Sequence, residues 1–235
     1  MFRSIFATNG SYWCWIISSR SWQPGWSEDL LARETVLFMI AGTENSGSTV
    51  ESCVAHLAGW FAEHPADREL AGPEPDDGFL QAAVNETIRL HTSGRKIHPR
   101  VAVRDVTLAC SGRSFARGEM VGLHLAAANR DTGVFGADAG RFDPHRAGRL
   151  DRKVKPYGVG FAAGTHVCMG KDLVTGDLEA TGRGGILLAV LRRWYRAGIA
   201  LDPDAPPVRS AEHEDRFRSF PVVFTRLAPQ REDTR

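Results

Sequence analysis

The stretch FAAGTHVCMG, residues 161–170, holds a single cysteine, Cys168, among glycines. A Gly-rich turn leaves backbone N–H groups unobstructed, so it can stabilise the negative charge of a thiolate. Such a turn also lets a flat macrocycle lie close to the chain, with the sulfur as an axial ligand of its metal. The pattern therefore makes Cys168 a candidate metal ligand. Phe161 would shield the sulfur, and Gly164 and Gly170 flank the cysteine.

Two other interpretations of this cysteine stay open at the level of the motif. A lone cysteine between glycines is often a buried structural residue in a loop. It could instead be a nucleophile activated by His166, although two residues so close in the chain rarely face each other and catalytic partners usually come from elsewhere in the fold. The rest of the sequence has to decide among the three.

Composition narrows the class of protein. Lys and Arg total 29 against 28 Asp and Glu, and this balance argues against a nucleic-acid or anionic-membrane partner. The longest apolar run, VLFMIAG at 36–42, is far shorter than the roughly 20 residues of a membrane-spanning helix. The four cysteines are scattered without a CxxC pair, which predicts neither a zinc site nor a disulfide framework and favours a reducing cytoplasm.

Hydrophobic spacing predicts a mainly α-helical protein with small β-sheets. Residues 1–26 hold four of the six tryptophans and are expected to form an extension, with a second unit over 27–235. Helical spacing and turn residues predict the elements of this unit. Helices are expected at 28–62, 79–91 and 186–195, strands within 97–126 and near 199–202 and 221–227, and a long loop over 127–168.

The middle of the first predicted helix is unusual. AGTENSGST at 41–49 places small and polar residues where a helix favours strong formers. Such a sequence predicts that something presses close to the helix or that its backbone is distorted there.

Two further motifs predict a buried ionic cluster. ETIR at 86–89 places Glu86 and Arg89 on one helix face, and RFDPHR at 141–146 adds Arg146. Taken alone, ETIR is more often a solvated surface pair. With the second arginine, one carboxylate and two guanidinium groups can form a triad that fixes a loop to a helix.

Read in order, the motifs AGTEN, ExxR, FDPxR and FxxGxHxCxG resemble those of the cytochrome P-450 family of haem-thiolate monooxygenases. The resemblance covers about residues 28–228 and includes ANRD at 128–131, which looks like soluble bacterial members. It implies the C-terminal portion of that fold, from the long central helix onward. A complete member has a large N-terminal portion, so we expect a truncated product, a fragment or half of a split protein.

The resemblance also implies a haem b site. Cys168 would be the axial thiolate ligand of the iron, with Phe161 as its shield and with Gly164 and Gly170 in its turn. His166 and Arg100 would hold the haem propionates. Behind the haem the structural triad would be formed by Glu86, Arg89 and Arg146, and the distal face would be lined by Ala41 and Gly42.

This sequence departs from the family in its proton relay. The family uses an acid followed by an alcohol, and here Glu44 is followed by Asn45 in place of the usual threonine. An amide can hold a water but cannot relay a proton by hydroxyl rotation. Ser46 or a substrate hydroxyl could substitute, and a peroxide-driven or dehydrating variant stays open. A second departure is the Gly-rich segment 171–185 after the cysteine, which predicts a short helix, a loop and a second helix at 186–197.

Three hypotheses follow for function. The first is a cytoplasmic haem-dependent monooxygenase that inserts one oxygen atom of O2 into a small organic substrate, with electrons from a ferredoxin-type or flavin-type partner. The second is a catalytically impaired remnant that binds haem weakly or not at all. The third is a cysteine hydrolase that uses Cys168 and His166.

Overall fold

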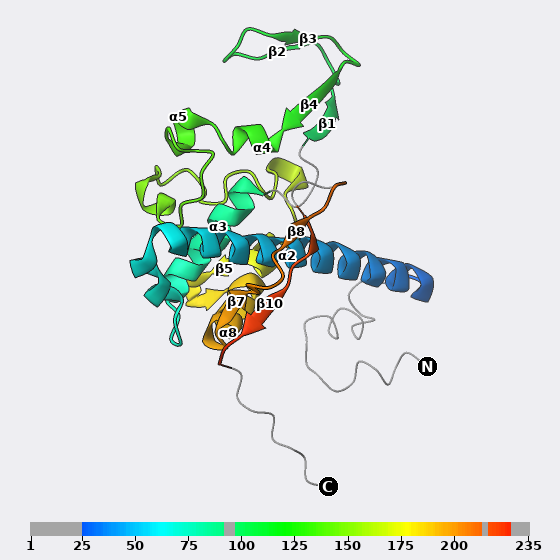
Figure 1. The fold of residues 1–235 in the computed structure, drawn as a ribbon. Coiled ribbons are helices and arrows are strands. Elements are labelled where there is room, and N and C mark those ends of the chain that lie inside the picture. The colour runs from blue at the N-terminus through cyan, green and yellow to red at the C-terminus, as the bar shows by residue number, and fades with distance from the viewer. Residues whose placement is uncertain (1–24, 92–96, 213–215, 227–235) are drawn as a thin grey trace. The chain divides into compact units, whose positions relative to one another are not determined.

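The computed structural model describes residues 25–91, 97–212 and 216–226, so the predicted extension over residues 1–26 lies almost entirely outside the described residues (Figure 1). The chain divides into two units, Met1–Glu44 and Asn45–Arg235. Each unit is considered by itself. Within the described residues no helix is both long enough and apolar enough to span a bilayer.

Helix α2 (Glu28–Glu63) matches the predicted first helix. The hydroxyl of Ser27 accepts a hydrogen bond from the Leu30 N–H at 3.2 Å, which caps the helix start. The helix remains regular through 41–49, so the predicted distortion there is wrong. Its polar residues bond to the helix itself: Thr49 Oγ1 donates to the carbonyl oxygen of Asn45 at 2.8 Å.

Two further helices complete the core of the second unit. Helix α3 (Asp77–Leu90) begins two residues earlier than predicted, because the Asp76 side chain caps it by accepting from the Phe79 N–H at 2.7 Å. Helix α8 (Ile186–Arg196) follows the prediction and packs against α3. Their apolar faces meet that of α2, and the fully buried side chains include Leu57, Leu80, Val84, Leu188 and Leu191.

The strands described form two-stranded antiparallel sheets. Strands are present in the predicted regions, 97–126, 199–202 and 221–227, and those at 176–177, 183–184, 208–209 and 217–219 were not predicted. The sheets described are β1 (Ile97–Val101) with β4 (Met120–His124), β2 (Val106–Thr107) with β3 (Ser114–Phe115), β5 (Gly176–Asp177) with β6 (Arg183–Gly184), β7 (Ile199–Leu201) with β10 (Val222–Phe224), and β8 (Val208–Arg209) with β9 (Phe217–Ser219).

The predicted strand region ends early, at β4. Helix α4 (Leu125–Ala128) occupies the residues that were expected to close it. The His124 ring caps this turn, since its Nδ1 accepts from the Ala127 N–H at 3.0 Å, and the alanines favour a helix.

The predicted loop over 127–168 is largely irregular. It contains only short helical turns among the elements described: α5 (Thr132–Phe135), η3 (Arg146–Arg149) and η4 (Gly164–His166). A separate short turn, η2 (Pro65–Ala71), follows α2. A loop of this length needs tertiary contacts to hold one conformation, because it lacks the hydrogen bonds of regular structure.

The chain after the cysteine is interrupted as predicted. Helix α6 (Lys171–Thr175) is short, α7 (Leu178–Thr181) lies between β5 and β6, and α8 then begins. Gly176 has φ +61°, and a Cβ there would overlap the Gly184–Gly185 backbone. The glycines are therefore required for the tight hairpin that separates the two helices.

Candidate functional site

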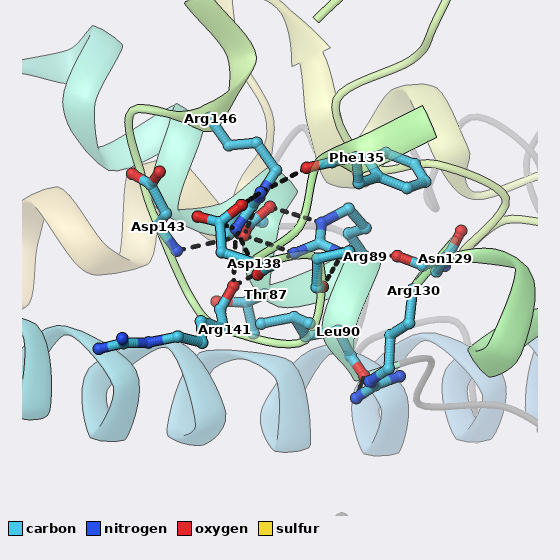
Figure 2. A network of polar contacts seen from close by, with 12 residues as sticks. Thr87, Arg89, Leu90, Asn129, Arg130, Phe135, Asp138, Arg141, Asp143 and Arg146 are labelled. Atoms are coloured by element: carbon cyan, nitrogen blue, oxygen red, sulfur yellow. Dashed lines mark hydrogen bonds and ion pairs between the residues drawn. The ribbon is translucent and has the colours of Figure 1, made fainter. Parts of the chain in front are cut away.

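The Glu86 carboxylate is shared by two buried arginines, Arg89 and Arg146. Figure 2 labels these two arginines within their network of polar contacts. Arg89, three residues later on α3, donates from Nε to Oε2 at 2.7 Å and from Nη2 to Oε1 at 2.6 Å. Arg146 donates from Nε to the same Oε1 at 2.9 Å, across 60 residues of sequence. The exposed fractions of the three side chains are 4%, 0% and 2%. One carboxylate thus accepts hydrogen bonds from two guanidinium groups in the interior.

The other arginine donors bind backbone carbonyls of the long loop. Arg89 Nη1 donates to the carbonyl oxygens of Asn129 at 2.5 Å and Ala139 at 2.7 Å, and Arg146 Nη1 donates to that of Phe135 at 2.6 Å. These bonds satisfy buried carbonyls that regular structure would otherwise pair. The long loop is therefore fixed to α3 by side chains.

A carboxylate at the edge of the cluster adds charge. Arg146 Nη1 donates to Asp138 Oδ1 at 2.8 Å, and this hydrogen bond lowers the pKa of Asp138. Asp138 is about half exposed, at 48%. It supplies negative charge where Arg146 approaches solvent.

Asn129 links the ionic cluster to the segment that precedes the cysteine. Its carbonyl accepts from Arg89, and its fully buried side-chain Oδ1 accepts from the Val159 N–H at 2.7 Å. A Cβ on Gly158 would overlap the Asn129 side chain, and a Cβ on Gly160 would lie 2.6 Å from Ile88 Cγ2. The chain at 158–160 therefore lies directly against Asn129 and α3, an approach that only glycine permits.

The Cys168 turn begins at the end of this anchored segment. The Phe161 ring packs partly buried against the core and meets Tyr157 edge-on, with ring centroids 5.1 Å apart. The Phe161 carbonyl accepts from the Cys168 N–H at 2.9 Å and closes the turn. Gly164 has φ +74°, a value that favours glycine.

The thiol of Cys168 is exposed, as are its neighbours Val167 at 41% and Met169 at 79%. The interpretation of Cys168 as a buried structural cysteine is therefore wrong. Gly170 lies beside the sulfur, since a Cβ there would be in van der Waals contact with Sγ, at 3.8 Å. The turn presents a sulfur atom among exposed apolar side chains, which a flat apolar ligand could cover favourably.

A single accessible thiol is a donor set that fits haem. Haem needs only an axial donor from the protein, because the porphyrin supplies the in-plane ligands, and a single accessible thiol is such a donor.

The two residues predicted to hold propionates are exposed. His166 lies in η4, two residues before the cysteine, and Arg100 lies in β1, where its Nη1 donates to the Pro99 carbonyl at 2.9 Å. Both are placed to reach an anionic group from solvent. The described structure shows no hydrogen bond between His166 and Cys168, so the geometry offers no support for the nucleophilic pair.

The predicted distal residues all lie in the middle of α2. Ala41, Gly42 and Glu44 belong to the first unit, while Asn45 and Ser46 begin the second. A Cβ added to Gly42 would have no described atom within 4 Å.

Sequence reasoning missed Asn129, Gly158 and Gly160. All three lie in stretches that carry a visible signal: ANRD resembles the family, and YGVG alternates glycine with larger residues before the cysteine motif. Alternating glycines can mark a close backbone approach.

We predict that Glu86→Gln lowers the free energy of unfolding by about 3–5 kcal/mol, because it removes the buried carboxylate that Arg89 and Arg146 share and leaves Arg146 paired with Asp138. Glu63→Gln is the matched control. Glu63 pairs with Arg141 at 3.3 Å on the surface, where both side chains are more than 60% exposed, and its loss should cost less than about 1 kcal/mol. Urea unfolding followed by tryptophan fluorescence compares them, and equal effects of the two substitutions would contradict the role given to Glu86.

Comparison with known proteins agrees with this geometry. Residues 78–179 match the family model described as Cytochrome P450. The steroid C26-monooxygenase of Mycolicibacterium smegmatis is 33% identical over 208 residues, which are 86% of this chain and 45% of the relative. The mycinamicin VIII C21 methyl hydroxylase of Micromonospora griseorubida is 30% identical over 179 residues, 76% of this chain and 40% of the relative. The chain thus spans less than half the length of these two relatives.

Solved structures show the same relationship. The crystal structure of P450BioI in complex with hexadec-9Z-enoic acid ligated acyl carrier protein has a TM-score of 0.60 and 26% identity, over 85% of this chain and 46% of that chain. The structure of CYP154C4 from Streptomyces sp. ATCC 11861 shares the fold. Its TM-score is 0.61, with 20% identity over 92% of this chain and 48% of that chain. The motif-bearing region and the fold together show that this chain belongs to the cytochrome P450 family and represents part of the P450 fold.

Proposed function

We propose that this chain is the haem-thiolate portion of a monooxygenase that inserts one oxygen atom of O2 into a small organic substrate. The observation that carries the proposal is the exposed Cys168 thiol, on a turn closed by the Phe161 carbonyl. Two relatives that are named as a monooxygenase and a hydroxylase support this class of reaction. Because the chain spans less than half of each, the activity of the whole protein stays a proposal.

Three residues of the second unit would hold the cofactor. Cys168 would donate its thiolate to haem b, and His166 and Arg100 would bind the propionates, since both are exposed donors. When bound, the haem would supply the activation of O2, with electron density pushed from the axial thiolate.

The chain's own contribution to the reaction would be proton supply and positioning. Glu44 is exposed on α2 and would take up protons from solvent. Asn45 would hold a water through its amide, and the partly buried Ser46 would provide a hydroxyl that can both donate and accept. The ionic cluster around Glu86 would keep the cysteine turn in place while the substrate is converted to product.

We further propose a ferredoxin-type or flavin-type electron donor and a cytoplasmic location. Electron transfer is required because monooxygenation uses two electrons for each O2 consumed. The scattered cysteines, including the free and exposed Cys110 and Cys168, favour a reducing compartment.

Two variants of this function make different predictions. An impaired remnant, which would bind haem weakly or not at all, is tested by haem uptake. A dehydrating enzyme is favoured by Asn45 and by the indoleacetaldoxime dehydratase of Arabidopsis thaliana, which is 31% identical over 150 residues. A dehydration consumes neither O2 nor electrons, so turnover without an electron donor would distinguish it.

We predict that the purified chain, supplied with haem, then reduced and exposed to carbon monoxide, gives the red-shifted band of a thiolate-ligated haem. Cys168→Ser should lose this band, because the hydroxyl is a poor substitute for a thiolate. Cys110→Ser, at a second exposed cysteine of the described residues, should keep it. Absence of haem uptake by the unmodified chain would overturn the proposal in favour of the remnant.

We also predict that Asn45→Thr raises the fraction of consumed electron donor that is recovered as product, because a hydroxyl can relay protons and an amide cannot. The control is Ser48→Ala, since the Ser48 hydroxyl donates back to the Asn45 carbonyl at 3.2 Å within the helix. Product, peroxide and donor consumption are measured together for a substrate that turns over. If the ratio of product formed to electron donor consumed is unchanged in Asn45→Thr, the proposed effect of Asn45 on proton delivery is wrong.

A further inference from the structure

Two histidines outside the proposed haem site bond directly to each other. His56 lies on the second half of α2 and His91 directly follows α3, 35 residues later. Their Nε2 atoms are 2.7 Å apart, and the ring centroids are 4.8 Å apart. At this distance one Nε2 carries the hydrogen and the other accepts it, which requires at least one ring to be neutral.

The histidine pair joins three parts of the second unit. The His56 ring stacks on Phe142, with centroids 4.6 Å apart and planes within 3° of parallel. Phe142 is followed by Asp143, whose N–H donates to Glu86 Oε1 at 3.2 Å. The pair therefore connects α2, the end of α3 and the loop at 141–146 that carries Arg146.

Positive charge surrounds this contact. His56 faces Arg130, which follows α4, and Arg209, in β8, as well as His91. Arg130 is held in place because its Nη2 donates to the Leu90 carbonyl at 2.7 Å, one residue before His91. Burial, followed by the charges of His91, Arg209 and Arg130, lowers the pKa of His56 to about 3.

Proton uptake would oppose this arrangement in two ways. A charge on either ring would lie in a partly buried position beside two guanidinium groups. Once both Nε2 atoms carry hydrogen, two N–H groups face each other and the hydrogen bond is lost.

We propose that the His56–His91 contact is an acid-labile latch, which closes when the pair is neutral and releases the Phe142 loop and the end of α3 when the pair takes up protons. The latch is independent of haem, since neither histidine belongs to the proposed cofactor site.

The direction of the pH effect follows from proton binding. His56 has an unfolded pKa of 6.5 and a much lower folded pKa, so between these values the unfolded chain binds more protons than the folded one. Stability from this group is complete above pH 6.5 and is lost as the pH falls below it. From this group alone, the unfolding equilibrium constant should rise about 100-fold between pH 7.5 and pH 4.5.

The first test uses the unmodified full chain. Histidine ring ¹⁵N shifts recorded by NMR from pH 7.5 to 4.5 report the protonation of each ring. The latch predicts that His56 stays neutral in the folded chain across this range. A His56 that titrates near pH 6.5, without loss of structure, would overturn the proposal.

The second test uses His56→Gln, whose side-chain amide can still hydrogen-bond to His91 but carries no charge. The rate of backbone amide hydrogen exchange at 86–91 and 141–146 is measured from pH 6.5 to 4.5 and corrected for the intrinsic effect of pH on exchange. The corrected rate should rise as the pH falls in the unmodified chain. In His56→Gln this rise should be much smaller. His98→Gln, on β1, is the control and should behave as the unmodified chain. Equal acid dependence in His56→Gln and the unmodified chain would refute the latch, and if His56→Gln does not fold, the NMR titration decides.

Discussion

The Glu86 carboxylate, shared between Arg89 and Arg146, is the interaction on which the second unit depends. Its Oε1 accepts from Arg89, from Arg146 and from the Asp143 backbone. Charged groups in the interior are tolerated only when nearly all of their donors and acceptors are hydrogen-bonded. Here the guanidinium N–H groups that do not bind Glu86 include several that donate to backbone carbonyls. The cluster thereby replaces the regular hydrogen bonding that the loop at 127–168 lacks.

A continuous series of contacts leads from this cluster to the cysteine. Arg89 holds the carbonyl of Asn129, and the Asn129 side chain holds the Val159 backbone. Two residues further on, the Phe161 carbonyl closes the turn of Cys168. The Cys168 sulfur is exposed, while the backbone of its turn is connected by hydrogen bonds to the buried ionic cluster. A metal ligand needs such support if its position is to stay fixed.

Much of this could be predicted from sequence because the signals were local. Helical spacing predicted α2, α3 and α8, and the three-residue spacing of Glu86 and Arg89 predicted their pairing on one face. The sequence could not predict which backbone carbonyls accept hydrogen bonds from the arginine side chains. The carbonyls that Arg89 and Arg146 bind belong to residues whose side chains carry no signal for it. The His56–His91 contact was also missed, because two histidines 35 residues apart have no pattern in common.

The central claim is that the turn held by this cluster presents Cys168 as the axial ligand of haem iron. X-ray absorption at the iron edge of the haem-loaded chain tests it most directly, because it reports the elements bound to the metal. The account predicts one sulfur atom in the coordination shell, and its loss in Cys168→Ser. A shell of nitrogen and oxygen alone, or a sulfur that persists in that variant, would contradict it.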